Sequence, residues 1–145
     1  MEYDYCIEMY LGGINLNYFY EPVNLKQWNM FEVVKSIGHI EPFLAVSSMN
    51  IGDIVFLHVG KQDRTYESGI YAYGRIVKGP YILKDSPQDY CNNKNTVDVE
   101  ILNISYSKPF VSWKISRNIF NQFRTVHKLD EVTVTKLLDV LDIKI

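Results

Sequence analysis

Two tyrosines and an arginine have the chemistry to hold a flat, negatively charged ligand. Tyr71 and Tyr73 are two residues apart, and Arg75 follows at the same spacing, so all three share one face if the segment is a strand. Aromatic rings stack on nucleobases, and a guanidinium pairs with phosphate. The spacing indicates a stacking surface beside a cation. A half-exposed sheet face without a ligand would carry the same pattern.

A second group of cations lies late in the chain. Arg117, Arg124, His127 and Lys128 occupy a segment without an acidic residue. Phosphate groups are neutralised mainly by Lys and Arg, so this segment is a candidate for contacts with a phosphate backbone. An earlier basic set surrounds the predicted hairpin and has a solvated loop as its alternative interpretation: Lys61, Arg64, Arg75 and Lys78.

The residues that usually carry catalysis or bind metal show no recognisable spacing. There is no His-Glu-x-x-His or Cys-x-x-Cys motif, glycine-rich phosphate loop, Ser-His-Asp arrangement or paired-carboxylate motif. The two cysteines, Cys6 and Cys91, are far apart and are interpreted as free thiols in a reducing compartment, with a single disulfide as the alternative. We therefore predict no catalytic residue, no metal and no cofactor.

The composition fits a globular chain with an excess of tyrosine. Of 145 residues, 47% are hydrophobic, 22% are charged and eleven are tyrosines, which suits one domain spanning residues 1–145. The net charge of −2 argues against nucleic-acid binding over a broad surface but allows a local basic patch. No apolar run reaches the roughly 18 residues of a membrane span, and the first residues lack a basic signal-peptide start. We expect a cytoplasmic protein without membrane contact.

Hydrophobic periodicity predicts a mostly antiparallel α+β fold. Strands are expected over 5–11, 14–20, 50–60, 69–77, 97–104 and 110–115, and loops over 39–49, 61–68 and 85–96. One helix is predicted over 25–37 with Asn24 as its N-cap. A second begins at Asp130 or Thr133 and carries an apolar stripe. Glycines within the strands indicate bends or close approaches, which favour a sheet curled into a barrel.

Several short motifs occur in a characteristic order. Gly52-Asp53 precedes a hydrophobic strand, Gly69-Ile70-x-Ala72-x-Gly74-x-Ile76 follows it, and Pro80 comes next. Val97-x-Val99 is then followed by Pro109, and Val132-Thr133-Val134-Thr135 leads into the last helix. In this order the motifs resemble the PUA-like superfamily and, within it, the EVE domains. The resemblance extends over roughly 40–141.

The resemblance implies a PUA-like β-barrel with flanking helices and an aromatic pocket. Relatives in the superfamily hold a flipped base there, in some cases a modified one, and stacking on an aromatic ring is worth about 1–3 kcal/mol per base. A non-catalytic nucleic-acid-binding module is therefore expected. Its site residues would be Trp28, Phe43, Tyr71 and Tyr73 for stacking, Ser47 and Ser48 for polar edges, and Arg75, Arg117 and Arg124 for phosphates.

Two functions from other classes stay open at this point. A small-molecule or nucleoside-amide hydrolase would use the same cavity, since the related ASCH group includes a hydrolytic branch. A protein-interaction module would use tyrosine-rich edge strands to pair with a partner or a second copy. Neither the choice between DNA and RNA nor the oligomeric state follows from the sequence.

Overall fold

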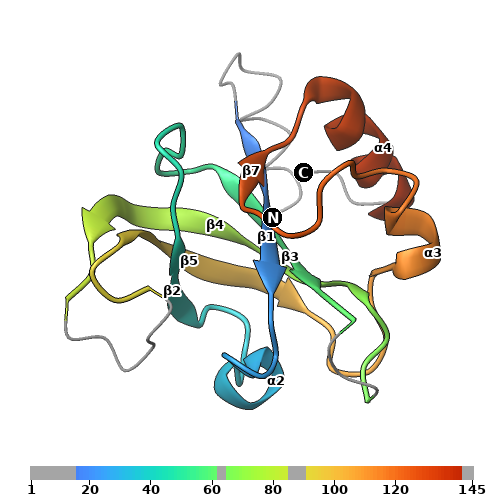
Figure 1. Cartoon of the computed structure of the whole chain (residues 1–145), viewed down its shortest axis with the longest axis horizontal. Coiled ribbons are helices and arrows are strands. Elements are labelled where there is room, and N and C mark those ends of the chain that lie inside the picture. Colours follow the sequence, from blue (N-terminus) through green and yellow to red (C-terminus); the bar gives the residue numbers. More distant parts are fainter. Residues whose placement is uncertain (1–15, 62–64, 85–90, 142–145) are drawn as a thin grey trace.

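The computed structural model describes residues 16–61, 65–84 and 91–141 (Figure 1). Three helices lie in these ranges, α2 (Met30–Val33), α3 (Trp113–Ser116) and α4 (Glu131–Leu141). The strands are β1 (Tyr18–Val23), β2 (Ile40–Leu44), β3 (Ile54–Val59), β4 (Gly69–Ile82), β5 (Asn95–Ile104), β6 (Val111–Ser112) and β7 (His127–Lys128). The strand expected over 5–11 lies outside the described residues. No helix of the described part is long and apolar enough to cross a bilayer.

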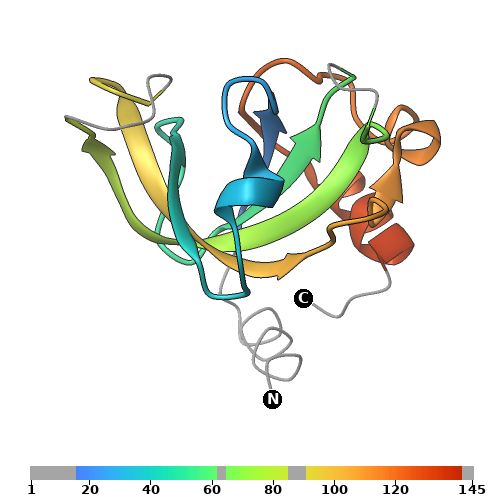
Figure 2. The same cartoon turned by 90° about the horizontal axis from the view of Figure 1, so that it is seen from below.

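The strands form one seven-stranded mixed sheet, which confirms the α+β class. Its order is β2-β5-β4-β3-β1-β7, and β6 pairs with the beginning of β4. All pairs are antiparallel except β1 with β3, which run parallel. The sheet bends strongly along β4 and β5 (Figure 2). It is not closed into the expected barrel, because no pairing among the described residues joins its edge strands, β2 and β7.

The predicted Gly-Asp start of a strand is confirmed at β3. Gly52 has a φ of 99°, a left-handed conformation that glycine adopts without strain. The Asp53 carboxylate accepts the backbone N–H groups of Asn17 at 3.1 Å and Asn50 at 2.9 Å. This carboxylate therefore ties the turn before β3 to the residue that precedes β1.

Close backbone approach explains the glycine inside β4. A Cβ atom at Gly74 would lie 2.5 Å from the Glu100 carbonyl oxygen and 2.5 Å from Val99 Cγ1 on β5. Irregularities in the β4–β5 register occur at Tyr73/Gly74 and twice more towards the end of β4. Bulges increase local twist and bend a strand, so these positions account for much of the curvature.

A bulge also overturns the expectation that Tyr71 and Tyr73 share a face. The β3–β4 register shifts between Leu57 and His58, leaving Tyr71 as an extra residue of β4. Tyr71 therefore packs in one hydrophobic cluster and Tyr73 in the other. Both side chains are buried, so they form no joint stacking surface with Arg75.

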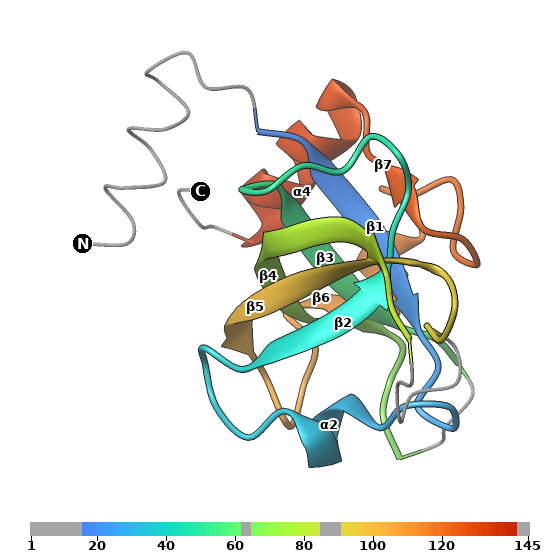
Figure 3. The ribbon, with the colours of Figure 1, turned by 90° about the vertical axis from the view of Figure 1, so that its left-hand side faces the viewer.

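The helix predicted over 25–37 is wrong in extent. The chain makes an isolated turn after Asn24, and the helix proper is only α2. Asn29 starts α2 as its N-cap by accepting the Phe31 N–H through its side chain, and Val34 is extended at its end. Asparagine favours caps over helix interiors, so Asn29 divides the segment. The loop expected over 39–49 instead contains β2, which lies at the sheet edge beside β5 (Figure 3).

Hydrophobic clusters cover both faces of the sheet. One contains Phe19, Val55 and Leu57 together with α2 and β2, and the other contains Tyr20 and Phe56. The second cluster is covered by α4, whose predicted start and stripe are confirmed. Asp130 Oδ1 accepts the Thr133 N–H at 2.7 Å, and the packed side chains are Val134, Leu137, Leu138 and Leu141.

Candidate ligand groove

A groove of about 630 Å³ has both aromatic and charged walls. We call it the groove. It lies where the end of β1 and the turn after it meet β2 and the segment before β7. Its lining is Glu21, Pro22, Val23, Asn24, Gln27, Trp28, Phe43, Leu44, Gly60, Lys94, Phe123, Arg124, Thr125 and Val126. These residues come from five separate stretches of the chain.

Two of the aromatic rings that line the groove pack against each other. Trp28 and Phe43 meet edge to face, with ring centroids 5.1 Å apart. They are 7% and 1% exposed, so both rings are held by packing within the hydrophobic cluster that they share. The Trp28 indole Nε1 is buried and has no hydrogen-bond partner among the described residues. A buried N–H without an acceptor is costly, because it has lost its water.

Glu21 places a carboxyl group at the same groove. The side chain alternates with Tyr20 along β1 and so shares the face of Phe19 and Val23. It is 2% exposed, and its Oε1 has no partner within the described ranges. Burial raises the pKa of this carboxyl well above its usual value, because a charge is poorly solvated away from water. Glu21 is therefore neutral over a wider pH range than an exposed glutamate.

Two cations stand at the rim. Lys94 precedes β5 and Arg124 precedes β7, and both side chains are exposed. They lie on different segments, yet they line one groove. With Glu21 neutral, the groove is positive at its mouth, although the chain as a whole carries a net charge of −2. The arrangement suits a ligand with a flat apolar part inside and a negative charge outside.

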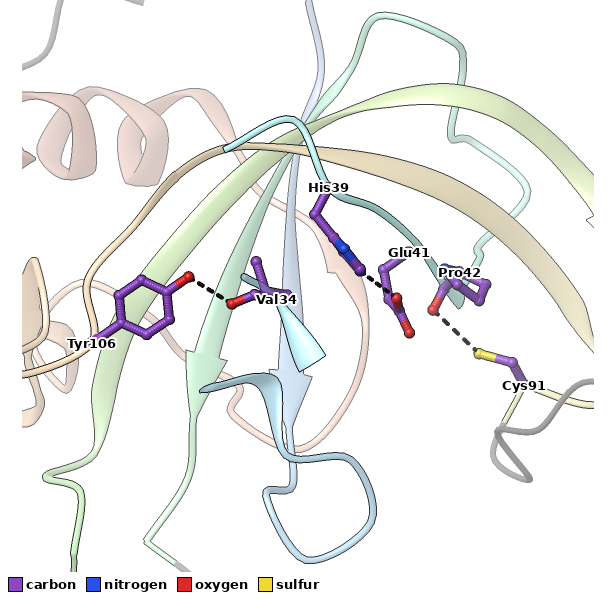
Figure 4. Close-up of polar contacts among 6 residues, drawn as sticks. All are labelled: Val34, His39, Glu41, Pro42, Cys91 and Tyr106. Carbon is purple, nitrogen blue, oxygen red and sulfur yellow. Dashed lines mark hydrogen bonds and ion pairs between the residues drawn. The ribbon is translucent and has the colours of Figure 1, made fainter. Parts of the chain in front are cut away.

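Polar contacts hold β2 and α2 in place beside the groove (Figure 4). The Cys91 thiol donates to the Pro42 carbonyl oxygen at 3.8 Å, directly before Phe43. His39 Nε2 and Glu41 Oε1 lie 2.6 Å apart. The Tyr106 hydroxyl donates to the Val34 carbonyl oxygen at 2.6 Å, linking the loop after β5 to the end of α2. The edge strand that carries Phe43 is thus held by the Cys91 contact and by its pairing with β5.

The structure brings three of the predicted site residues together in the groove: Trp28, Phe43 and Arg124. Ser47 and Ser48 are exposed in the turn after β2 and do not line it. Tyr71 is fully buried and donates its hydroxyl to the Glu67 carbonyl oxygen at 2.6 Å. Tyr73 packs on the opposite face.

The other two predicted arginines lie elsewhere. Arg75 pairs with Glu100 at 2.9 Å, across from it on β5. Arg117 is exposed at the C-terminal end of α3. Of the predicted hairpin set, Lys61 lies over the Trp113 ring and Lys78 over the Tyr81 ring, so these cations do not gather into a patch.

Sequence reasoning missed Glu21 and Lys94. A signal for Glu21 was present, since this carboxyl interrupts an otherwise apolar run, Tyr18-Phe19-Tyr20-Glu21-Pro22-Val23. The strand predicted over 14–20 stopped short of this residue, whereas β1 continues through Pro22 to Val23. No local signal marks Lys94, because only the fold brings this residue to the groove.

His58 lies near the end of β3, where a side chain is often partly exposed. It is nevertheless only 2% exposed, and its Nε2 lies 3.1 Å from Ser116 Oγ. Burial lowers the pKa of His58 to about 4. This histidine is a neutral core residue. In the part of the chain that the structure describes, no three His, Cys, Asp or Glu side chains gather to hold a metal ion.

Comparisons with known proteins bear on the fold. No protein-family model matches the sequence, and a search of curated proteins gives no match. A hypothetical protein from Leishmania major has a similar structure, with a TM-score of 0.61 at 11% identity over 88% of this chain and 96% of that one. A protein from Pseudomonas syringae gives 0.57 at 15% identity, over 86% and 99% of the two chains.

A protein of known domain class also has a similar structure. An ASCH protein from Zymomonas mobilis matches with a TM-score of 0.50 at 8% identity, over 84% of this chain and 94% of that one. At these identities the likeness shows the fold alone. It supports the PUA-like curved sheet that the sequence motifs predicted. Membership of the EVE domains in particular stays a prediction.

Proposed function

We propose that this protein is a non-catalytic nucleic-acid-binding module that holds one unstacked base in the groove. Trp28 and Phe43 contact the base, and Arg124 and Lys94 contact the flanking phosphates. The observation that carries the proposal is that these residues meet in one cavity with two buried polar atoms, on Glu21 and Trp28, that have no hydrogen-bond partner in the described part of the chain. A structural core has no need of such groups, whereas a ligand edge would satisfy them.

The dimensions of the groove support this assignment. Its volume of about 630 Å³ lies within the usual range for small-ligand sites, about 300–1,000 Å³. A base taken out of its stack regains about 1–3 kcal/mol on an aromatic platform. A PUA-like fold is compatible with this way of binding a base, and the resemblance to EVE domains extends the expected ligands to modified bases. Tyr71, Tyr73, Ser47, Ser48 and Arg75 have no part in this version of the site.

Salt dependence of binding tests the proposal. We expect short single-stranded RNA or DNA, about 10 nucleotides long, to bind with a slope in log K against log salt of about −0.7 for each phosphate neutralised. The double variant Lys94→Gln/Arg124→Gln should make the slope shallower by about 1.4. Fluorescence anisotropy between about 50 and 200 mM KCl measures it.

A matched control uses two exposed cations outside the groove. Lys114→Gln/Arg117→Gln removes the same charge from α3 and its C-terminal end. If only the groove pair changes the slope, the phosphates lie at the groove. An equal effect of the control pair would extend the contact surface to Arg117, as the sequence predicted. The proposal is abandoned if neither RNA nor DNA, methylated or unmethylated, binds better than about millimolar at low salt.

One observation favours a second candidate, a hydrolase that uses the same groove. A buried carboxyl with a raised pKa is suited to general acid–base catalysis. Incubating the protein with nucleoside amides separates the two candidates, because a binding module turns nothing over. A hydrolase would release product, and Glu21→Gln would abolish the release.

A further inference from the structure

We propose that Glu21 and Trp28 read the edge of the bound base and select a pyrimidine over a purine. This inference rests on the proposed function, since it names which ligand the groove prefers. Both side chains line the groove, both are more than nine-tenths buried, and each has a polar atom without a partner among the described residues. The ligand that binds must satisfy both.

The hydrogen-bonding capacity of these two groups defines the complementary edge. The Trp28 indole N–H donates and never accepts, so it needs an acceptor. A neutral carboxyl has one donor and one acceptor, so Glu21 needs an acceptor and a donor. The neutral form of Glu21 is favoured because its carboxyl is buried and its Oε1 has no partner, cation or other, among the residues that the structure describes. The ligand edge must therefore offer two acceptors and one donor.

Only the pyrimidines offer this set on their pairing edge. Cytosine presents its O2 and N3 as acceptors and its amino group as a donor. Uracil and thymine present two carbonyl oxygens as acceptors and the N3–H group as a donor. Adenine has one acceptor and one donor on that edge, and guanine has one acceptor and two donors. Each purine would leave a buried polar group unsatisfied, at a cost of about 1–3 kcal/mol.

Stacking would oppose this preference, because purines have the larger ring area. A preference for pyrimidines would therefore be due to hydrogen bonding, provided that the preference disappears when the Glu21 carboxyl or the Trp28 N–H is removed. The positive rim excludes a rival ligand, a methylated ammonium group, which would suit an aromatic pocket beside an ionised carboxylate. Lys94 and Arg124 would repel such a cation.

The test uses abasic strands of about 10 nucleotides with a single cytosine, uracil, adenine or guanine at the centre. Anisotropy titrations with the wild-type protein should give about tenfold tighter binding of the two pyrimidines. Trp28→Phe keeps a ring and deletes the N–H, and Glu21→Leu deletes the carboxyl. Both variants should bring the four affinities close together.

Glu21→Gln provides the conservative variant. Its amide has a donor and an acceptor, as a neutral carboxyl does, so it should retain the pyrimidine preference. A merely structural role for Glu21 would not separate glutamine from leucine in this way. Thermal unfolding of each variant verifies folding, and because Trp28 and Glu21 are replaced separately, failure of one variant to fold leaves the other as a test.

The possible outcomes distinguish the pyrimidine preference from the proposed nucleic-acid binding on which it rests. Equal binding of all four strands, with the expected salt dependence, overturns the pyrimidine reading and leaves nucleic-acid binding intact. Tighter binding of guanine, lost in Glu21→Gln, overturns it as well, because it would show an ionised carboxylate. If no strand binds and the salt experiment also fails, both proposals fall.

Discussion

Two of the aromatic regions in the described part of the molecule differ in how the hydrogen-bonding groups of their polar side chains are satisfied. The first is the groove. The second, which we call the enclosed cluster, consists of Tyr20, His58, Trp113, Phe120 and Phe123. In the enclosed cluster the Tyr20 hydroxyl donates to the Phe123 carbonyl oxygen at 3.0 Å, and His58 pairs with Ser116. In the groove, Glu21 Oε1 and Trp28 Nε1 have no partner within the described part of the chain.

The contrast shows that aromatic content does not identify a ligand site. The enclosed cluster has more rings than the groove, yet its Tyr20 hydroxyl and its His58 imidazole make hydrogen bonds within the protein. The groove has fewer rings and leaves its hydrogen-bonding capacity for something else. Phe123 belongs to both, since it packs on Trp113 with centroids 4.8 Å apart and also lines the groove. It therefore lies between the enclosed cluster and the groove.

The largest expected effect is the loss of a ring from the enclosed cluster. Phe120→Ala should destabilise the protein by about 3–5 kcal/mol, because Phe120 is 4% exposed and packs on both Tyr20 and His58. Urea unfolding measures the change. Ile115→Ala, at an exposed position on α3, is the control and should stay within about 0.5 kcal/mol. A loss below about 1 kcal/mol for Phe120→Ala would show that the cluster is loosely packed.

Acid should destabilise the enclosed cluster through His58. Its pKa is about 4 in the folded state against 6.5 as the reference value. Between these values the unfolded chain binds a proton that the folded chain does not, so stability falls as the pH decreases from 6.5 to 4. The full loss is about 3 kcal/mol. Denaturant unfolding as a function of pH measures it.

The matched variant for that experiment is His58→Gln, which keeps a side chain able to reach Ser116 and does not titrate. The other histidines are present in both proteins and cancel in the difference. We expect the wild-type protein to lose stability relative to the variant in this pH window. If stability depended on pH in the same way in both proteins, His58 would take up its proton equally in the folded and unfolded states, and the lowered pKa would be wrong.

The groove should respond to pH in the opposite direction. The pKa of Glu21 is raised in the folded state, so above the unfolded value of about 4.5 the folded chain retains a proton that the unfolded chain releases. Stability is therefore lost as the pH rises, with a slope of at most about 1.4 kcal/mol per pH unit. Glu21→Gln should become more stable than the wild type as the pH increases, with little difference near pH 4. A constant difference across the range would mean that Glu21 is ionised like an exposed glutamate.

The sequence predicted the elements whose signals are local. The Gly52-Asp53 turn, the alternation in β5 and the stripe on α4 each depend on neighbours in the chain, and all three are confirmed. The faces of Tyr71 and Tyr73 depend on a bulge that forms only when β4 pairs with β3. Simple alternation could not reveal it.

The candidate site was only partly predictable for the same reason. Trp28 and Phe43 were identified as aromatic candidates, but their meeting requires the turn after β1 to pack on β2. Glu21 looks like an ordinary charged strand residue until both faces of β1 are covered. Arg124 and Lys94 are about thirty positions apart in the sequence, and only the folded sheet places both at one rim.

The smallest expected effect is spectroscopic, and it uses the fact that each aromatic region has one of the two tryptophans. Trp28 lies in the groove, whereas Trp113 packs on Phe123 and carries Lys61 over its ring at 4.3 Å. A base stacked beside Trp28 should change the fluorescence of the Trp113→Phe protein, which retains only Trp28. The Trp28→Phe protein should respond weakly, through Phe123 alone. Oligonucleotide titrations of both single-tryptophan proteins measure this, and a larger response from Trp113 would move the binding site from the groove to the face of the enclosed cluster.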